Sequence, residues 1–289
     1  MRDRLRKIKL TIEMREAATA YTFLIPWLIG FGLFVCYPLG YSLYISFHEV
    51  RVSGMGVKYI PLGWQNYTNA FLKDNTFAFD LFNYFKQTLI TIPMIVIFAL
   101  FVALMLNIRF PGRMLFRTVF FLPVIFATGQ VLTELFDQNA GGLSILDQYD
   151  ITGFIQQNLP KTLAEPILEV LQTFIIILWF SGVQVLIYIA GMQTIGKSVY
   201  EAARIDGASP WEVMWKITLP GTAPFIVLNL MYTIVDMFTF PLSPILKYIN
   251  LGSNFGYTAA IGWIYFTFVF LLIVVTLAIA NRFSIRQNK

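Results

Sequence analysis

Long apolar stretches separated by short charged segments dominate the chain. Stretches without a charged residue cover 17–47, 87–108, 118–133, 170–196, 217–235 and 248–281. A helix needs about 20 apolar residues to cross the hydrocarbon core of a bilayer. We therefore predict an all-α, polytopic membrane protein with six spanning helices. The third must continue past Glu134 to reach that length, and the fifth past Asp236.

The predicted helices form one transmembrane domain, 17–289, after a basic cytosolic segment, 1–16. Their approximate bounds are 17–47, 87–108, 117–136, 168–194, 217–240 and 257–281. The basic segment either fixes the topology or lies as a short helix on anionic lipid. The first stretch is longer than the apolar core of a cleaved signal peptide, so we expect it to be retained. Pro26 and Pro38 are expected to kink or interrupt it, which would place part of it along the membrane surface.

The composition agrees with a membrane protein and excludes several classes of function. Of the 289 residues, 57% are hydrophobic and 13% are charged, whereas about 25% are charged in soluble domains. This excludes a water-soluble enzyme. The net charge of +5 does not indicate nucleic-acid binding, because the basic residues lie at the ends of apolar stretches. With a single cysteine and a single histidine, Cys36 and His48, we expect no intrachain disulfide and no metal site.

The distribution of lysine and arginine predicts the orientation. With the N-terminus inside, 15 of the 21 basic residues fall on the cytosolic side. This bias follows the positive-inside rule and, with six spans, places both termini in the cytosol. The long loops, about 48–86 and 137–169, then lie outside, where they could receive a soluble partner.

The segment 196–220, predicted to lie on the cytosolic side, carries the most explicit local signals. Good helix formers occupy 198–205, and Gly207 is suited to end that helix in the left-handed conformation. Ser209 and Glu212 have the spacing of a capping box, with Pro210 at the first helical position. The sequence therefore predicts two short helices joined at a glycine. By itself, this pattern also fits an ordinary loop with Trp211 and Trp215 at the membrane interface.

The same segment resembles the EAA motif of binding-protein-dependent ABC importer permeases, which reads EAA-x3-G-x9-I-x-LP. Glu201, Ala202 and Ala203 begin the motif, and the remaining positions follow at its spacing. These are Gly207, Ile217, Leu219 and Pro220, together with the common Asp206. GWQNYTNAF at 63–71 and RTVFFLP at 117–123 are similar to further segments of sugar-type permeases. The chain thus resembles the first permease subunit of a maltose or glycerol-3-phosphate type pair.

The resemblance implies a type I importer permease fold and a set of partners. The segment 196–220 would be the coupling helix that seats in a groove of a separate ATPase, with Glu201 pairing with a basic residue there. Two ATPase subunits, a second homologous permease chain and an extracellular or periplasmic solute-binding protein would complete the importer in a bacterial cytoplasmic membrane. This chain would need no cofactor, because ATP and Mg²⁺ are used by the ATPases.

One motif match is misleading. GMQTIGKS at 191–198 satisfies the phosphate-loop pattern, but that pattern cradles phosphate only between a strand and a helix of a soluble α/β domain. Here an apolar spanning helix precedes it. We therefore expect no nucleotide site in this chain.

A polar stripe on the fifth predicted helix indicates the translocation path. Asp236 is ionisable and lies within a spanning helix, which makes it a functional candidate. Helical spacing gives it polar and aromatic neighbours on one face, expected to look into a cavity: Asn229, Tyr232, Thr233, Thr239 and Phe240. Ser181, Gln184 and Tyr188 form a parallel set on the fourth helix, and Gln130 and Glu134 are weaker candidates on the third. The alternative is that these groups only hydrogen-bond neighbouring helices.

We therefore predict a permease subunit of an ABC importer for a sugar or oligosaccharide, which is not itself an enzyme. The alternatives are a permease for another polar solute, such as a polyol phosphate, and a secondary carrier. A carrier would show broken helices in two matching halves, which the sequence lacks. A membrane-embedded enzyme is disfavoured by the lack of paired catalytic carboxylates.

Overall fold

A computed structural model describes residues 12–54, 56–108, 110–126, 150–240, 243–250 and 254–287. The chain divides into two compact units. The first comprises the residues up to Lys73 together with Gly252–Trp263, and the second comprises Asp74–Leu251 and Ile264–Lys289. The predicted boundary at residue 16 stays a prediction, since residues 1–11 lie outside the described part.

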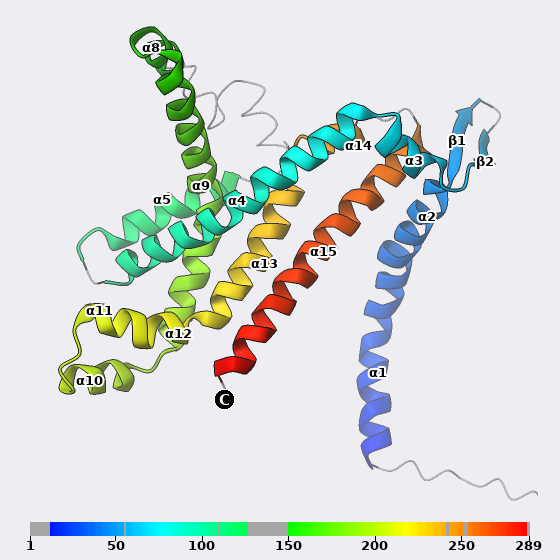
Figure 1. The fold of residues 1–289 in the computed structure, drawn as a ribbon. Helices are drawn as coiled ribbons and strands as arrows, with labels where there is room; N and C mark the ends of the chain where they lie inside the picture. Colours follow the sequence, from blue (N-terminus) through cyan, green and yellow to red (C-terminus); the bar gives the residue numbers. More distant parts are fainter. Residues whose placement is uncertain are drawn as a thin grey trace, which may run out of the picture. The chain divides into compact units, whose positions relative to one another are not determined.

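The first unit begins with a long, exposed helical stretch (Figure 1). It comprises α1 (Ile12–Phe31), a π-helical turn η1 (Gly32–Cys36) and α2 (Tyr37–Ser46). The chain stays helical through Pro26, whereas the α-helix gives way to the π-helical turn η1 directly before α2, which contains Pro38. The placement of part of this stretch along the membrane surface stays a prediction. Pro38 lies in the first turn of α2, where its missing amide hydrogen needs no partner within the helix. The π-helical turn η1, with its wider hydrogen-bond spacing, accommodates the proline. Residues Thr19–Ser46 therefore form one candidate span of 28 residues.

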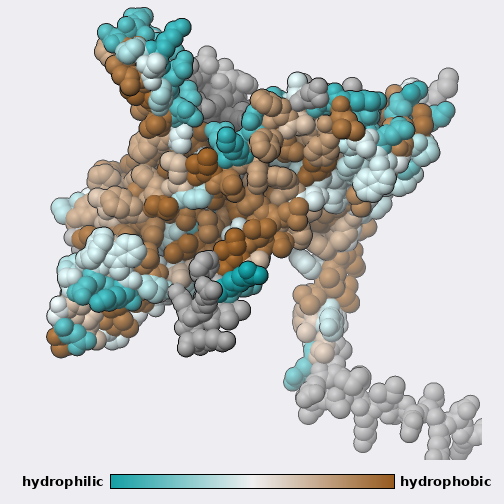
Figure 2. All heavy atoms as spheres, viewed as in Figure 1, coloured by the Kyte–Doolittle hydropathy of each residue, from teal (hydrophilic) through white to brown (hydrophobic). Residues whose placement is uncertain are grey.

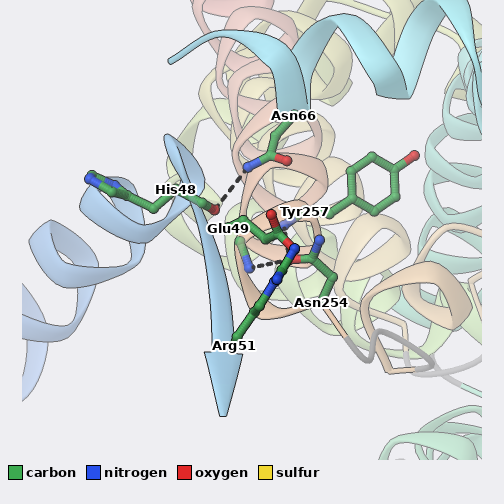
Figure 3. Close-up of polar contacts among 7 residues, drawn as sticks. His48, Glu49, Arg51, Asn66, Asn254 and Tyr257 are labelled. Carbon is green, nitrogen blue, oxygen red and sulfur yellow. Dashed lines mark hydrogen bonds and ion pairs between the residues drawn. The ribbon is translucent and has the colours of Figure 1, made fainter. Parts of the chain in front are cut away.

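A two-stranded hairpin and a short helix follow in the same unit. Strands β1 (His48–Ser53) and β2 (Gly56–Pro61) pair antiparallel, with Val50 opposite Tyr59. The helix α3 (Gln65–Leu72) comes next, and the long helix α15 (Phe255–Gln287) starts in this unit. Asn254 caps α15, because its Oδ1 accepts hydrogen bonds from the amides of Gly256 and Tyr257 at 3.1 and 3.3 Å (Figure 3).

Asn66 ties α3 to the end of α2 and the start of β1. Its side-chain nitrogen donates to the carbonyl oxygen of Ser46 at 2.8 Å. The same nitrogen donates to the carbonyl oxygen of His48 at 3.1 Å (Figure 3). The side chain is buried, and the hydroxyl of the adjacent Tyr67 lies 2.7 Å from that of Ser46. The asparagine and tyrosine of the GWQNYTNAF segment thus hold the hairpin to the first span.

Substituting Asn66→Asp should destabilise the chain by roughly 3 kcal/mol, because a carboxylate cannot donate to two buried carbonyl oxygens. The measurement is the midpoint of thermal unfolding in detergent. Gln65→Glu, the same chemical change at an exposed neighbouring position, should leave the midpoint nearly unchanged. Equal midpoints for Asn66→Asp and the natural chain would contradict this role of Asn66.

The core of the second unit is the crossing of two long helices, α4 (Asn75–Asn107) and α9 (Lys161–Thr194). Ala99 and Ala103 of α4 are fully buried in a cluster with Val185, Tyr188 and Ile189 of α9. Small residues of this kind let helix backbones approach closely in membrane proteins. Helices α5 (Arg113–Phe126) and α13 (Ala223–Thr239) also pack on α9.

Several helix ends differ from the predicted bounds, because charged residues were taken as limits. Helix α4 begins at Asn75 rather than residue 87, and α9 begins at Lys161 rather than residue 168. The carboxylate of Asp80 in α4 is paired by two residues of α14 (Leu246–Asn250). Lys247 forms an ion pair with it at 2.9 Å, and the Tyr248 hydroxyl donates a hydrogen bond to it at 2.7 Å. The short helix α8 (Ile151–Asn158) precedes α9.

The fifth predicted helix, 217–240, is broken near its start. Residues Pro210–Gly221 and Ala223–Thr239 meet at an angle of 62°. Of the third predicted helix, 117–136, only the part to Phe126 is described, so Gln130 and Glu134 lie outside the described residues. Within the described part, four helices are long and apolar enough to cross a membrane, or five if the bent pair is one span. The number six stays a prediction.

Two tyrosine hydroxyls cap the C-terminal end of α13. Tyr84 of α4 donates to the carbonyl oxygen of Met237 at 2.7 Å, and Tyr265 of α15 donates to that of Phe238 at 2.7 Å. The Phe238 ring packs against both tyrosine rings, with centroids 5.5 Å apart in each case. These bonds satisfy carbonyl groups that have no partner within the helix. Helix α13 is thereby fixed to α4 and α15 at this end.

Candidate functional site

The segment that carries the EAA pattern folds into short helices at one end of the second unit (Figure 1). They are α10 (Lys197–Ile205), α11 (Pro210–Val213), a π-helical turn η2 (Met214–Thr218) and α12 (Leu219–Gly221). The predicted pair of short helices is confirmed, and η2 and α12 continue the second of them to the bend before α13.

Gly207 forms the turn between α10 and α11. Its φ is +76°, the left-handed conformation predicted from the sequence. The amide of Gly207 donates to the carbonyl oxygen of Arg204 at 3.1 Å, and the amide of Ala208 donates to that of Ala203 at 2.9 Å. This pair of bonds is the Schellman motif, which satisfies the last carbonyl groups of the helix. Glycine adopts this conformation without the strain imposed by a Cβ atom.

Ser209 and Glu212 form the predicted capping box at the start of α11. The Ser209 hydroxyl accepts from the amide of Glu212 at 3.3 Å, and the Glu212 carboxylate accepts from the amide of Ser209 at 3.0 Å. Lys216 also pairs with Glu212 at 3.2 Å. These contacts, led by the Ser209 amide, lower the pKa of Glu212 to about 2. The start of α11 is therefore fixed by local bonds at any physiological pH.

The segment presents charged and apolar side chains to its surroundings. Glu201, Ala202, Asp206 and Pro220 are exposed, whereas Ala203 is buried and Ile217 and Leu219 are half-buried. The motif residues thus divide between packing and exposed positions.

Sequence reasoning missed Ile205, whose side chain is 86% exposed. Trp211 and Trp215 are also exposed, with ring centroids 5.5 Å apart. A large apolar side chain this exposed suits a protein contact. The only signal for Ile205 in the sequence was its place among the three positions that the EAA motif leaves open between Ala203 and Gly207.

Hydrogen bonds connect the short helices to one another and to α13. The Tyr200 hydroxyl of α10 lies 3.2 Å from that of Thr218 in η2. Thr222, at the bend, donates its hydroxyl to the carbonyl oxygen of Thr218 at 2.9 Å. A Cβ on Gly221 would lie 2.7 Å from the end of the Ile195 side chain, so the bend also packs on the residue after α9. The coupling segment and the start of α13 are therefore joined by direct contacts.

The phosphate-loop match falls at the junction of two helices. Gly191 lies in α9, and Gly196 precedes α10. A Cβ on Gly191 would lie 2.5 Å from the Phe225 ring of α13. Its lack of a side chain therefore serves close helix packing. The residues before this match are helical, whereas a phosphate loop follows a strand.

The residues predicted for the path, on the fourth and fifth helices, divide into two groups. Four of them meet between α9 and α13 and are fully buried: Gln184, Tyr188, Asn229 and Thr233. Gln184 donates to the Thr233 hydroxyl at 3.1 Å, and Asn229 donates to the backbone oxygen of Gln184 at 3.3 Å. These bonds connect the two helices, whereas the buried Ser181 bonds only within α9, at 3.0 Å to the Leu178 oxygen.

The second group lies at the edge of this interface. Asp236, Tyr232 and Phe240 are half-buried, and Thr239 is exposed. The Phe240 ring packs edge-on against Phe180, with centroids 5.2 Å apart, and Thr239 bonds to the Val235 oxygen at 2.8 Å. Within the described part of the chain, the Asp236 carboxylate has no hydrogen-bond or ion-pair partner. Asp236 is the ionisable member of the stripe and, unlike Asn229 and Thr233, it is not fully buried.

A cleft of about 840 Å³ lies on a different face of α13 from the one predicted. Its lining comes from α4, α13 and α15 together with Pro220 of α12 and is mostly apolar, and it contains no residue of the polar stripe. Among the described residues, no three His, Cys, Asp or Glu side chains come together as a metal site would require.

Comparisons with known proteins agree with these features. The family described as binding-protein-dependent transport system inner membrane component matches residues 68–288. A sulfoquinovosyl glycerol transport system permease of Agrobacterium fabrum is 32% identical over 79% of this chain and 74% of its own. An arabinooligosaccharides transport system permease of Bacillus subtilis is 30% identical over 86% and 78%.

A solved structure shows the same fold. It is a bacterial alginate ABC transporter in complex with its pentasaccharide-bound periplasmic protein. The matching chain has a TM-score of 0.65 at 18% identity and covers 94% of this chain and 96% of its own.

Proposed function

The chain belongs to the family of binding-protein-dependent transport system inner membrane components, and from this premise we propose that it is the permease subunit of a sugar or oligosaccharide importer. The relatives named above carry sugar derivatives or oligosaccharides according to their names. The observation that carries the proposal is the segment from α10 to α12, where capped short helices stand against a bend that leads into α13.

This geometry provides a mechanical route from an ATPase to the membrane. In the proposed importer, α10 and α11 seat on an ATPase subunit through Glu201, Ile205 and the tryptophans. Closure of two ATPases moves α10, and the bonds of Tyr200 and Thr222 pass that motion to α13. Packed elements with two arrangements transmit such motions. Helix α13 would then shift against the path that Asp236 borders.

The remaining parts of the importer are proposed partners. They are two ABC ATPases, which use ATP and Mg²⁺, a second homologous permease chain and a solute-binding protein on the outer side. The chain itself would need no cofactor. We place it in a bacterial cytoplasmic membrane with both termini in the cytosol, since that orientation puts most basic residues inside.

A neutral sugar fits the proposed path better than a polyol phosphate. Helix α13 contains Asp236 and no lysine or arginine. An anionic substrate next to an unpaired carboxylate would be repelled in a medium of low dielectric constant. Carboxylate, hydroxyl and aromatic groups together suit the hydroxyls and apolar faces of a sugar ring.

The test is a gentle-detergent pull-down of the tagged chain, followed by identification of the proteins recovered and an assay of ATPase activity. We expect a second permease and an ATPase, with Glu201→Ala reducing ATPase recovery about tenfold, which corresponds to about 1.4 kcal/mol. Glu169→Ala, an exposed glutamate at the other end of α9, serves as the control. Recovery of this chain without any ATPase would contradict the proposal and favour a secondary carrier.

A further inference from the structure

The apolar cleft along α4, α13 and α15 is not filled by side chains of the described residues. Helix α15 contributes little buried surface, since only 6% of its most apolar window is covered, compared with 44% for α4. Few side chains of the described residues therefore cover this helix. Figure 2 shows apolar side chains over the middle of this unit and polar side chains at α8 and around α10 and α11.

The lining of the cleft suits a hydrocarbon chain and does not suit a sugar. Ile92, Leu230, Ile234 and Leu272 are representative, and the polar side chains are Thr276 and Asn281. The Thr276 hydroxyl already donates to the Leu272 oxygen at 2.9 Å. A sugar would lose its hydrogen bonds to water here without replacement, at a high cost in free energy. An apolar space of this kind binds apolar molecules instead.

The length and position of the cleft match one leaflet of a bilayer. Along α13 it extends from Ala223 to Ile234, about 17 Å at 1.5 Å per residue. One leaflet contributes about 15 Å of hydrocarbon. At the Ala223 end Pro220 of the coupling segment also lines the cleft, and the α15 end is Asn281. Arg282, the next residue, is exposed and positively charged.

We propose that this cleft binds an acyl chain of an anionic phospholipid, whose phosphate pairs with Arg282. The hydrocarbon fills the space between α13 and α15, and the headgroup stays at the membrane surface beside Asn281. The assignment to the cytosolic leaflet rests on the orientation given under the proposed function. The binding of lipid to the cleft does not depend on that orientation, so the lipid proposal and the proposed function can fail separately.

Native mass spectrometry of the intact complex tests this proposal. The complex is purified in detergent and incubated with equal amounts of phosphatidylglycerol and phosphatidylethanolamine. We expect one phosphatidylglycerol to stay bound to the natural protein. Val227→Trp, which fills the cleft, should reduce its occupancy at least fivefold. Leu228→Trp, at an exposed neighbouring position outside the cleft, should not.

A second substitution tests the headgroup contact. Arg282→Gln should remove the preference for phosphatidylglycerol over phosphatidylethanolamine, whereas Lys197→Gln, an exposed basic residue at the start of α10, should leave it unchanged. Equal lipid occupancy in the natural protein and Val227→Trp would overturn the proposal. So would a complex that holds no lipid while the isolated chain does, because a partner helix would then cover the cleft.

Discussion

Replacing Gly207 with valine should reduce ATP-driven uptake by about tenfold or more while the chain still inserts into the membrane. The φ of +76° at this position is strained for any residue with a Cβ and most strained for a β-branched one. The strain is about 1–3 kcal/mol, enough to change the angle between α10 and α11. Uptake by the reconstituted importer and its stimulated ATPase activity are the quantities to measure.

The cause of this effect can be isolated. A Cβ on Gly207 would meet no atom of the described residues within 4 Å, so the expected cause is backbone strain and not a collision within the chain. Gly207→Asn should keep most of the uptake, because asparagine tolerates the left-handed conformation, and Gly207→Ala should be intermediate. Uptake by Gly207→Val close to that of the natural chain would show that the turn is not needed for coupling.

Asp236→Ala should reduce sugar uptake about tenfold or more, with ATPase assembly unchanged. The carboxylate is half-buried in α13 and forms no hydrogen bond or ion pair with the described residues, so its removal breaks no bond among them. An intramembrane carboxylate without such a structural role is retained for its ligand or path. Uptake of several labelled sugars, with the amount of assembled complex measured in parallel, provides the test.

A matched variant separates the path from the helix contacts. Thr233→Val preserves the shape of its side chain and removes the hydroxyl that accepts from Gln184. It should lower thermal stability by about 1 kcal/mol, since a buried donor loses its partner. Asp236→Ala should show the opposite profile, with stability retained. If uptake of every sugar tested stays normal in Asp236→Ala, the carboxylate does not border the path.

The coupling segment could be predicted in detail because its structure is local. The capping box of Ser209 and Glu212, the proline between them and the left-handed Gly207 each depend on residues fewer than six positions apart. Such short-range rules operate independently of the rest of the fold. The sequence therefore indicated both helices and the turn before any tertiary contact was known.

The residues at which the helices begin and the burial of the polar stripe depend on contacts with residues that are distant in the sequence. Asp80 was treated as a limit of a span, yet Lys247, far away in the sequence, lies 2.9 Å from it within the fold. Helical spacing grouped Asn229 with Asp236 but could not show that α9 covers only the first of these. The cleft was likewise beyond prediction, since helices far apart in the sequence line it together.

The two tyrosine caps determine how α13 can move during transport. Sliding along its axis would break the bonds from Tyr84 and Tyr265 together. Tilting about that end keeps both. The helix has 17 residues and so a length of about 25 Å, over which a tilt of about 5° carries the bend at Thr222 through about 2 Å. The hydroxyls therefore act as a pivot that magnifies a small rotation into a displacement the size of an ordinary interface shift.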